Sequence, residues 1–184
     1  MPISREHVSA EVEEYLRLHP GEFDRLEPLT TALAQAAEPT SRSCLPGHVT
    51  VNAVLLDPDD RVLHIHHVAL DRWLTPGGHC EAEGSSLIGA ALRELREETG
   101  IAPESVRPTE AYATRPIDID VHAIPANDEK GEPAHWHYDF RFVFRVGAGV
   151  DVGRLQAAEV AGAAWLSFAD TACPQIARKL ASML

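Results

Sequence analysis

Hydrophobic residues recur at helical spacing in two stretches at the start of the chain. From about residue 5 to 19 they follow one another at intervals of three and four, until Pro20-Gly21 interrupts the pattern. A second helical pattern spans about residues 22–37, and the proline-containing stretch at 39–46 is typical of a linker. We therefore expect residues 1–44 to form an N-terminal helical extension, which could be a packing element alone, cap the core, cover a substrate or make a homodimer contact.

Strand patterns follow the linker. Residues 49–56 are mostly apolar, as in a strand that is buried on both faces. The turn at 57–60 then leads into a hairpin partner at 61–68. Later elements are predicted at 106–114 (strand), 161–166 (strand with Trp165 pointing inward) and 175–184 (helix that Pro174 precedes).

Two alternating segments predict a pair of strands between residues 117 and 145. Apolar and polar residues alternate at 117–122, and the aromatic residues from Trp136 to Phe144 alternate with polar ones. We expect the aromatic side chains to lie in a core, which sends the polar ones to the opposite face. Antiparallel pairing would place one polar set on the same side of the sheet: Asp118, Asp120, His122, His137, Asp139 and Arg141.

This polar set has three interpretations. It is either an ordinary solvated sheet face or the wall of a substrate site, over which the loop at 125–135 would close. The second interpretation has a physical basis, because several kinds of ionisable side chain are costly to bury outside a wet, charged cavity. In the third, His135 and His137 bind a transition metal, since alternate residues share one strand face. The substrate-binding hypothesis assigns His122, His137, Asp139 and Arg141.

The stretch at 76–101 carries the clearest candidate chemistry. Its second half has apolar residues at helical spacing and ends on a glycine, as a helix often does. Glu94, Glu97 and Glu98 stand at i, i+3 and i+4, so their carboxylates converge on one patch. Like charges at this spacing repel, and a hard divalent cation such as Mg²⁺ would offset the repulsion. The alternative is a solvated acidic helix face that neighbouring arginines balance.

The same stretch resembles the Nudix box, a pattern of Gly, five residues, Glu, seven residues and then Arg-Glu-aliphatic-x-Glu-Glu-x-Gly-aliphatic. The first half departs, because His79 and Ser85 stand where the pattern has Gly and Glu. Gly78 lies one residue too early, which indicates one extra loop residue, and Glu81 or Glu83 could replace the missing carboxylate. The second half matches at Arg93, Glu94, Leu95, Glu97, Glu98, Gly100 and Ile101.

The resemblance implies an α/β fold, a Nudix-like mixed sheet sandwiched between helices, with the Nudix hydrolase domain at 45–184. It implies a Mg²⁺- or Mn²⁺-dependent hydrolase that cleaves the pyrophosphate bond of a nucleoside diphosphate linked to another moiety. The general base is left open between a Glu near the metal and a residue of 118–139, and Glu159 is a further candidate carboxylate. The resemblance assigns Arg93, Glu94 and Glu97 as catalytic, and Glu94, Glu97, Glu98 and the backbone carbonyl of Gly78 as metal ligands.

The charge and cysteine content of the chain limit the kinds of partner and the compartment that we expect. A net charge of −12 argues against nucleic acid or an anionic membrane as partner, while a small nucleotide or diphosphate substrate can bind through a cation. Three scattered cysteines without metal-ligand spacing indicate free thiols in a reducing cytosol, so we expect a cytoplasmic protein. The sequence has neither an apolar run of about 18 residues nor a signal-peptide pattern.

Two other functions are compatible with the same resemblance. An isoprenoid diphosphate isomerase of this fold would need a catalytic cysteine in the core, whereas Cys44 precedes the first strand and Cys80 lies in the box loop. A non-catalytic nucleotide-binding sensor would have no need for three clustered acids. The intact second half of the box therefore favours the hydrolase.

Overall fold

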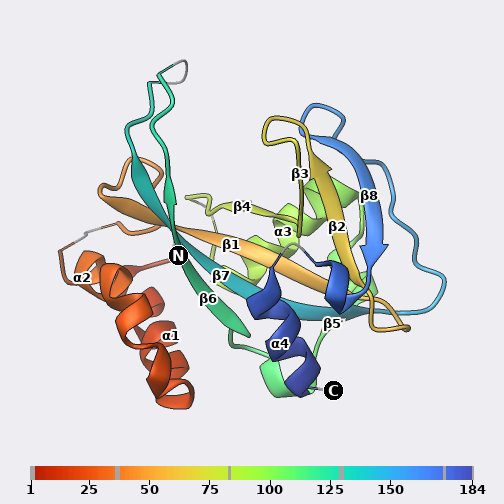
Figure 1. Cartoon of the computed structure of the whole chain (residues 1–184), viewed down its shortest axis with the longest axis horizontal. Helices are drawn as coiled ribbons and strands as arrows, with labels where there is room; N and C mark the ends of the chain where they lie inside the picture. Colours follow the sequence, from red (N-terminus) through yellow and green to blue (C-terminus); the bar gives the residue numbers. More distant parts are fainter. Residues whose placement is uncertain (1–2, 36–37, 83, 129–130, 172, 184) are drawn as a thin grey trace. The chain divides into compact units, whose positions relative to one another are not determined.

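The structure, a computed structural model, describes residues 3–35, 38–82, 84–128, 131–171 and 173–183. The chain has a mixed α/β fold, as predicted, and begins with a helix (Figure 1). Among the described residues, no helix has the length and apolar character needed to cross a membrane. The α-helices are α1 (Arg5–Leu18), α2 (Glu27–Gln35), α3 (Leu87–Thr99) and α4 (Pro174–Met183).

Hydrogen-bonded strands form one large sheet. Its main path runs β3-β2-β1-β7-β5, while β4 pairs with β1, β6 with β7 and β8 with β2. The register of the β2–β8 pair is antiparallel, and it shifts between His66 and His67. The strands are β1 (Gly47–Leu56), β2 (Val62–His67), β3 (Arg72–Leu74), β4 (Gly77–His79), β5 (Val106–Pro108), β6 (Asp118–Ile124), β7 (His135–Val146) and β8 (Val160–Leu166).

The chain contains two compact units, and several helices and strands contribute residues to both. The boundaries fall inside β1, β4, α3, β6 and β7. The first unit comprises Met1–Val51, His79–Ala90 and Ile119–Phe140, and the second comprises Asn52–Gly78, Ala91–Asp118 and Arg141–Leu184.

The N-terminal helices pack inside the first unit, where α1 and α2 lie side by side (Figure 1). Arg25 donates a hydrogen bond to the carbonyl of Ile119 in β6 and forms an ion pair of 3.6 Å with Asp120. The Tyr138 hydroxyl of β7 donates to the carbonyl of Pro28 at 3.4 Å. These contacts bind the helical extension to strand residues of the same unit. The buried residues of the two helices are Val8, Val12, Tyr15, Leu29, Ala32 and Leu33.

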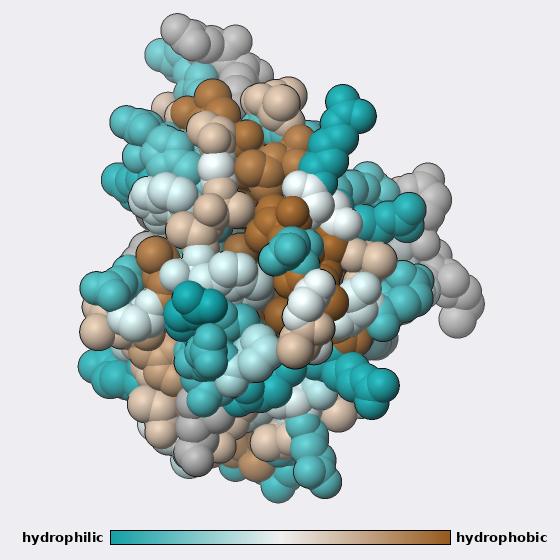
Figure 2. Space-filling model, turned by 90° about the vertical axis from the view of Figure 1, so that its right-hand side faces the viewer, coloured by the Kyte–Doolittle hydropathy of each residue, from teal (hydrophilic) through white to brown (hydrophobic). Residues whose placement is uncertain are grey.

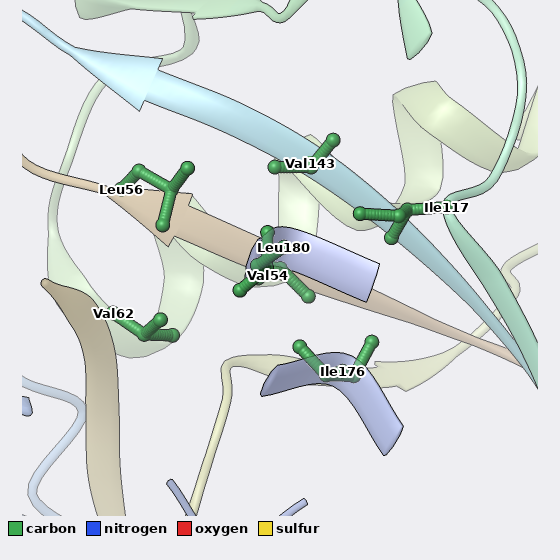
Figure 3. Packing of buried hydrophobic residues seen from close by; sticks show 7 residues of the cluster. All are labelled: Val54, Leu56, Val62, Ile117, Val143, Ile176 and Leu180. Atoms are coloured by element: carbon green, nitrogen blue, oxygen red, sulfur yellow. The ribbon is translucent and has the colours of Figure 1, made fainter. Parts of the chain in front are cut away.

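The second unit has a core of aliphatic side chains from β1, β2, β7 and α4 (Figure 3). Ile176 and Leu180 stand one helical turn apart, so α4 presents both to the strands. On the face drawn in Figure 2, hydrophobic residues form a band between hydrophilic ones. The exposed large hydrophobic residues of this unit are Val68, Leu70 and Trp73. The core cluster comprises Val54, Leu56, Val62, Ile117, Val143, Ile176 and Leu180.

Two predicted elements have the wrong bounds. The helix expected at about 22–37 is α2, which begins only at Glu27 and follows two short 3₁₀ turns. The strand expected at 106–114 is β5, which ends at Pro108. The next residue, Thr109, makes one more backbone hydrogen bond to Val143 of β7 before the chain turns away. A 3₁₀ turn at Glu110–Tyr112 occupies the rest of that segment.

Two aromatic side chains are less buried than predicted. Trp136 was expected in the core but is 37% exposed, since it lies near the start of β7. Trp165 of β8 is only partly buried. The remaining aromatic residues of β7 are in the core as expected: Tyr138, Phe140, Phe142 and Phe144.

Candidate functional site

Helix α3 has one buried apolar face and one acidic face. Leu87, Ala91 and Leu95 are almost completely buried and recur at four-residue spacing. The Ser86 hydroxyl accepts a hydrogen bond from the N–H of Gly89 at 3.1 Å, which satisfies one free donor of the first turn. Gly100 ends the helix with a φ of 71°, a conformation that few other residues adopt easily. The acidic side chains are thereby held on a helix with defined ends.

Arg93 links two of the predicted site carboxylates. Its guanidinium donates to Glu94 Oε1 at 2.7 Å and to Glu97 Oε2 at 2.6 Å. Charge-assisted bonds of this kind fix both partners in direction as well as in distance. The two glutamates differ in exposure, because the side chain of Glu97 is 48% exposed and that of Glu94 only 13%. Arg93 therefore holds one inner and one outer carboxylate together.

Glu98 is the most deeply buried of the three acids. Only 2% of the residue is exposed, and its Oε2 accepts a hydrogen bond of 2.9 Å from the N–H of Gly77. Burial raises the pKa of Glu98 to about 8, the Gly77 bond opposes this shift, and the charges of Glu94, Glu159 and Glu97 add to it. The carboxyl is therefore largely protonated near pH 7 unless a cation compensates its charge.

Strand β4 packs its glycines directly against these acids. A Cβ added at Gly78 would lie 2.7 Å from the carboxyl carbon of Glu94, so only glycine fits without displacing that side chain. Burial is also the main cause that raises the pKa of Glu94, and Arg93 opposes it. Gly78 thus allows the strand backbone to approach Glu94 closely, and the N–H of Gly77 contacts Glu98.

Glu159 joins the same electrostatic site from a segment just before β8. Its charge raises the pKa of both Glu94 and Glu98, which places it within range of both. The donors are therefore carboxylate oxygens, with Arg93 paired to two of them. Hard cations such as Mg²⁺ and Mn²⁺ prefer oxygen donors of this kind. A divalent cation fits this set because it would stabilise the ionised form of Glu98, which burial disfavours.

The polar side chains predicted on β6 and β7 form hydrogen bonds with different residues in each of the two units. In the second unit, Asp118 is fully buried and accepts hydrogen bonds from Arg141 at 3.0 Å and from Lys179 of α4 at 2.7 Å. In the first unit, the buried Asp139 accepts a hydrogen bond of 3.2 Å from the Thr50 hydroxyl. Arg141 thus contacts an acid of the sheet and Asp139 a neighbouring strand.

The two predicted substrate-binding histidines belong to a larger group in the first unit. His122 Nδ1 lies 3.1 Å from Asp120 Oδ2, and its ring is 5.6 Å from that of His137. The ring of His137 also lies 4.8 Å from that of His48 and 5.3 Å from that of His79. Sequence reasoning missed His48 and His79, because no spacing relates either of them to β7.

The departing first half of the box lies mostly in the loop before α3. Glu81 is exposed, and Ser85 is exposed just before the helix begins. Glu83, the other proposed replacement for the missing carboxylate, is outside the described residues. The role of either glutamate stays a prediction.

Comparisons with known proteins address the family directly. The sequence profile of the NUDIX domain matches residues 46–184. The chain belongs to the Nudix family. This confirms the resemblance on which the site assignment rests.

Relatives of this Nudix protein support the fold. A "Probable DHNTP pyrophosphohydrolase" of Lactococcus lactis subsp. cremoris is 31% identical over 94 residues, which are 51% of this chain and 52% of that protein, so the match spans about half of the relative. An Ap4A hydrolase of C. elegans in a binary complex superposes with a TM-score of 0.57 at 18% identity, covering 73% of this chain and 96% of that one. A NUDIX-family hydrolase from Clostridium perfringens gives a TM-score of 0.53 at 20% identity, covering 74% and 98%. At these identities the two structures establish the fold alone.

Proposed function

We propose that this Nudix protein is a Mg²⁺- or Mn²⁺-dependent pyrophosphohydrolase that acts on a small molecule carrying a diphosphate group. The observation that carries the proposal is the packing of Glu94 and Glu98 of α3 against the Gly77-Gly78 backbone. Buried carboxylates whose pKa is raised gain most from a bound cation. A solvated acidic helix face would not bury Glu98 to 2% exposure.

The residues divide into ligands and a positioning group. Glu94, Glu97 and Glu98 would hold the cation, with the carbonyl of Gly78 as a further ligand. When bound, such an ion neutralises phosphate oxygens and lowers the pKa of a coordinated water. Arg93 fixes Glu94 and Glu97 through its two charge-assisted bonds, so both carboxylates keep one orientation toward the ion. We assign Arg93, Glu94 and Glu97 to catalysis on this basis.

The substrate class follows from the family and from the named relative. We infer a nucleoside diphosphate linked to another moiety, and the "DHNTP" in the relative's name adds dihydroneopterin triphosphate to the candidates. His122, His137, Asp139 and Arg141 remain the proposed substrate-binding residues. The protein's net charge of −12 supports binding of such anions through a cation rather than through a basic surface.

A hydrolysis panel tests this function. Purified protein is incubated with dinucleoside polyphosphates, nucleotide sugars, ADP-ribose, oxidised nucleoside triphosphates and dihydroneopterin triphosphate, with Mg²⁺, with Mn²⁺ or with EDTA. We expect metal-dependent cleavage between two phosphates, identified by the masses of both products. Glu98→Gln should lose it, whereas Glu110→Gln, which changes an exposed glutamate of the same unit, should keep it. Tight substrate binding without turnover in any metal would instead indicate a nucleotide-binding module.

A further inference from the structure

A second group of ionisable side chains lies in the first compact unit and is made of imidazoles. The ring of His48 has its centroid 5.1 Å from that of His79, 5.0 Å from that of His135 and 4.8 Å from that of His137. These four histidines come from the start of β1, the end of β4 and the start of β7. Packing alone does not require polar rings here, so the positions of their nitrogens carry the chemical information.

Three ring nitrogens converge. One nitrogen each from His48, His135 and His137 lies within 4.8 Å of the other two. The Nε2 atoms of His135 and His137 are 3.2 Å apart. Two imidazole nitrogens bound to one tetrahedral ion, at the usual distance of about 2.0–2.1 Å, are about 3.3–3.4 Å apart. The observed pair therefore has nearly the separation that a shared ion would give.

The hydrogen bond on the far side of His135 fixes its tautomer. His135 Nδ1 lies 2.8 Å from the carbonyl oxygen of Pro133, and a carbonyl can only accept, so Nδ1 carries the hydrogen. In the neutral ring, Nε2 then presents a lone pair toward His137. A histidine that donates one N–H to a backbone carbonyl and offers the other nitrogen is typical of metal ligands.

His48 supplies an independent observation. It is 2% exposed, and within the described residues neither of its ring nitrogens meets the geometry of a hydrogen bond. The backbone of Cys44 is close enough to act weakly on the ring, but it does not satisfy a nitrogen at hydrogen-bond distance and angle. A buried polar atom without a partner is costly, and a bound ion would remove part of that cost.

The charge state of the His48 and His137 rings is compatible with metal binding. Burial lowers the pKa of His48 to about 4 and that of His137 to about 3, with neighbouring histidines adding to both shifts. Both rings are therefore neutral at pH 7, so neither has to lose a positive charge before it binds a cation. In the metal-free protein His137 Nε2 donates its hydrogen to His135 Nε2, and this hydrogen has only to move to Nδ1 for His137 Nε2 to offer a lone pair.

We propose that His48, His135 and His137 form a three-histidine site for a transition-metal ion of the Zn²⁺ class. Its ligands are histidines of the first unit, whereas the carboxylates of α3 belong to the second unit. Imidazole nitrogen suits Zn²⁺, Co²⁺, Ni²⁺ and Cu²⁺, whereas Mg²⁺ takes oxygen. Three histidines leave a fourth position open for water or another donor. Within the first unit, the ion would connect the start of β1 to the start of β7.

Cobalt substitution tests the site without any measurement of turnover. Co²⁺ is titrated into EDTA-treated, desalted full-length protein, and visible absorption is recorded. We expect one equivalent to give the intense bands of a four-coordinate ion with nitrogen ligands, and one equivalent of Zn²⁺ to remove them. Only the weak bands of six-coordinate Co²⁺ at every ratio would overturn the proposal.

Variants assign the ligands. His135→Ala and His137→Ala should each weaken Zn²⁺ binding at least about 100-fold, because even loss of an outer partner of a ligand costs 10–100-fold. Two controls should keep the wild-type affinity and spectrum: His66→Ala, which removes a half-buried histidine of the second unit, and Glu98→Gln. Circular dichroism and the Tm in EDTA show whether each variant is folded. Should one alanine variant fail to fold, His48→Gln replaces it in the comparison.

Two results would contradict the assignment. If folded His135→Ala and His137→Ala bind Zn²⁺ as tightly as the wild type, the histidines are not ligands. If Glu98→Gln abolishes the cobalt spectrum, the ion sits on the carboxylates of α3. The hydrolase proposal is tested by product masses and these readouts by spectra and affinities, so each can fail without the other.

Discussion

Burial acts in opposite directions on the two clusters of ionisable side chains. In the second unit it raises the pKa of Glu94 and Glu98, and in the first it lowers the pKa of His48 and His137. In both clusters the cause is the same, because burial disfavours the charged form of the side chain. Their consequences for metal binding differ, because a neutral imidazole already offers a lone pair whereas a protonated carboxyl must first lose its proton. The proposed oxygen site therefore needs a cation to ionise it, whereas the His48 and His137 rings of the proposed nitrogen site are already neutral.

The largest expected effect concerns the oxygen site. Glu97→Gln and Glu98→Gln should each lower kcat/KM by about 10²- to 10³-fold, the loss seen when one preorganised electrostatic group is removed. Neither should lower the Tm of the metal-free protein near pH 7. Glu97→Gln removes one of several like charges, and Glu98→Gln replaces a carboxyl that is largely neutral without a cation. Steady-state kinetics and thermal unfolding in EDTA measure the two quantities. Near-normal turnover at low Mg²⁺ would show that the ligand assignment is wrong.

The second-largest effect shows whether Arg141 stabilises the fold through its ion pair or binds substrate. Arg141→Met should lower the free energy of unfolding by on the order of 3 kcal/mol, because it removes one partner of the fully buried Asp118. Arg145→Met is the control, since its ion pair with Asp60 is partly exposed and contributes about 1 kcal/mol or less. Urea unfolding measures both. If Arg141→Met kept full stability and raised KM, its role would be in substrate binding alone.

A smaller effect follows from the opposite pKa shifts. Glu98 has a folded pKa of about 8 against an ordinary value of 4.5, so the folded metal-free protein holds a proton that the unfolded chain releases. Its contribution makes stability fall as the pH rises toward 8. His48 and His137 have folded pKa values below 6.5, so their contribution makes stability fall as the pH drops below 6.5.

Thermal unfolding in EDTA between pH 4 and 9 resolves these contributions. Glu98→Gln should flatten the decline between pH 6.5 and 8, and His137→Ala should flatten the decline on the acid side. Parallel profiles for the wild type and Glu98→Gln would show that Glu98 is ionised in the metal-free protein.

The smallest effect concerns the loop before α3. Ser85 cannot replace a carboxylate electrostatically, so the double variant Glu81→Ala/Glu83→Ala should lower kcat/KM more than Ser85→Ala does. Both are compared at equal Mg²⁺ on the substrate that the panel identifies. The reverse ranking would place the extra loop residue elsewhere and shift the alignment of the box.

The grouping of the three acids of the proposed oxygen site was predictable because they lie within five positions of one helix. Helical spacing alone brings Glu94, Glu97 and Glu98 together, and the Nudix resemblance adds Gly78. The grouping of the three histidines of the proposed nitrogen site was only partly predictable. The spacing of His135 and His137 indicated a shared strand face, but His48 joins them only through the tertiary structure.

The hydrophobic pattern predicted the long regular elements of the fold better than the short ones. The box helix and the alternating strand β7 were predicted, since each has a strong period and a length above ten residues. The end of β5 at Pro108 and the 3₁₀ turns before α2 were missed, because hydrophobic spacing does not distinguish such turns from regular elements. The ion pair between Asp118 and Lys179 was missed for another reason, since Lys179 lies on α4, far away in the sequence.

Manganese binding tests directly whether the α3 carboxylates hold a hard divalent cation. The hexaaqua Mn²⁺ signal in electron paramagnetic resonance is followed while wild type, Glu98→Gln and His137→Ala are titrated with Mn²⁺. We predict that the wild type and His137→Ala bind the ion with equal affinity and that Glu98→Gln binds it at least tenfold more weakly. Equal binding by Glu98→Gln and the wild type, or loss of binding in His137→Ala alone, would contradict the claim.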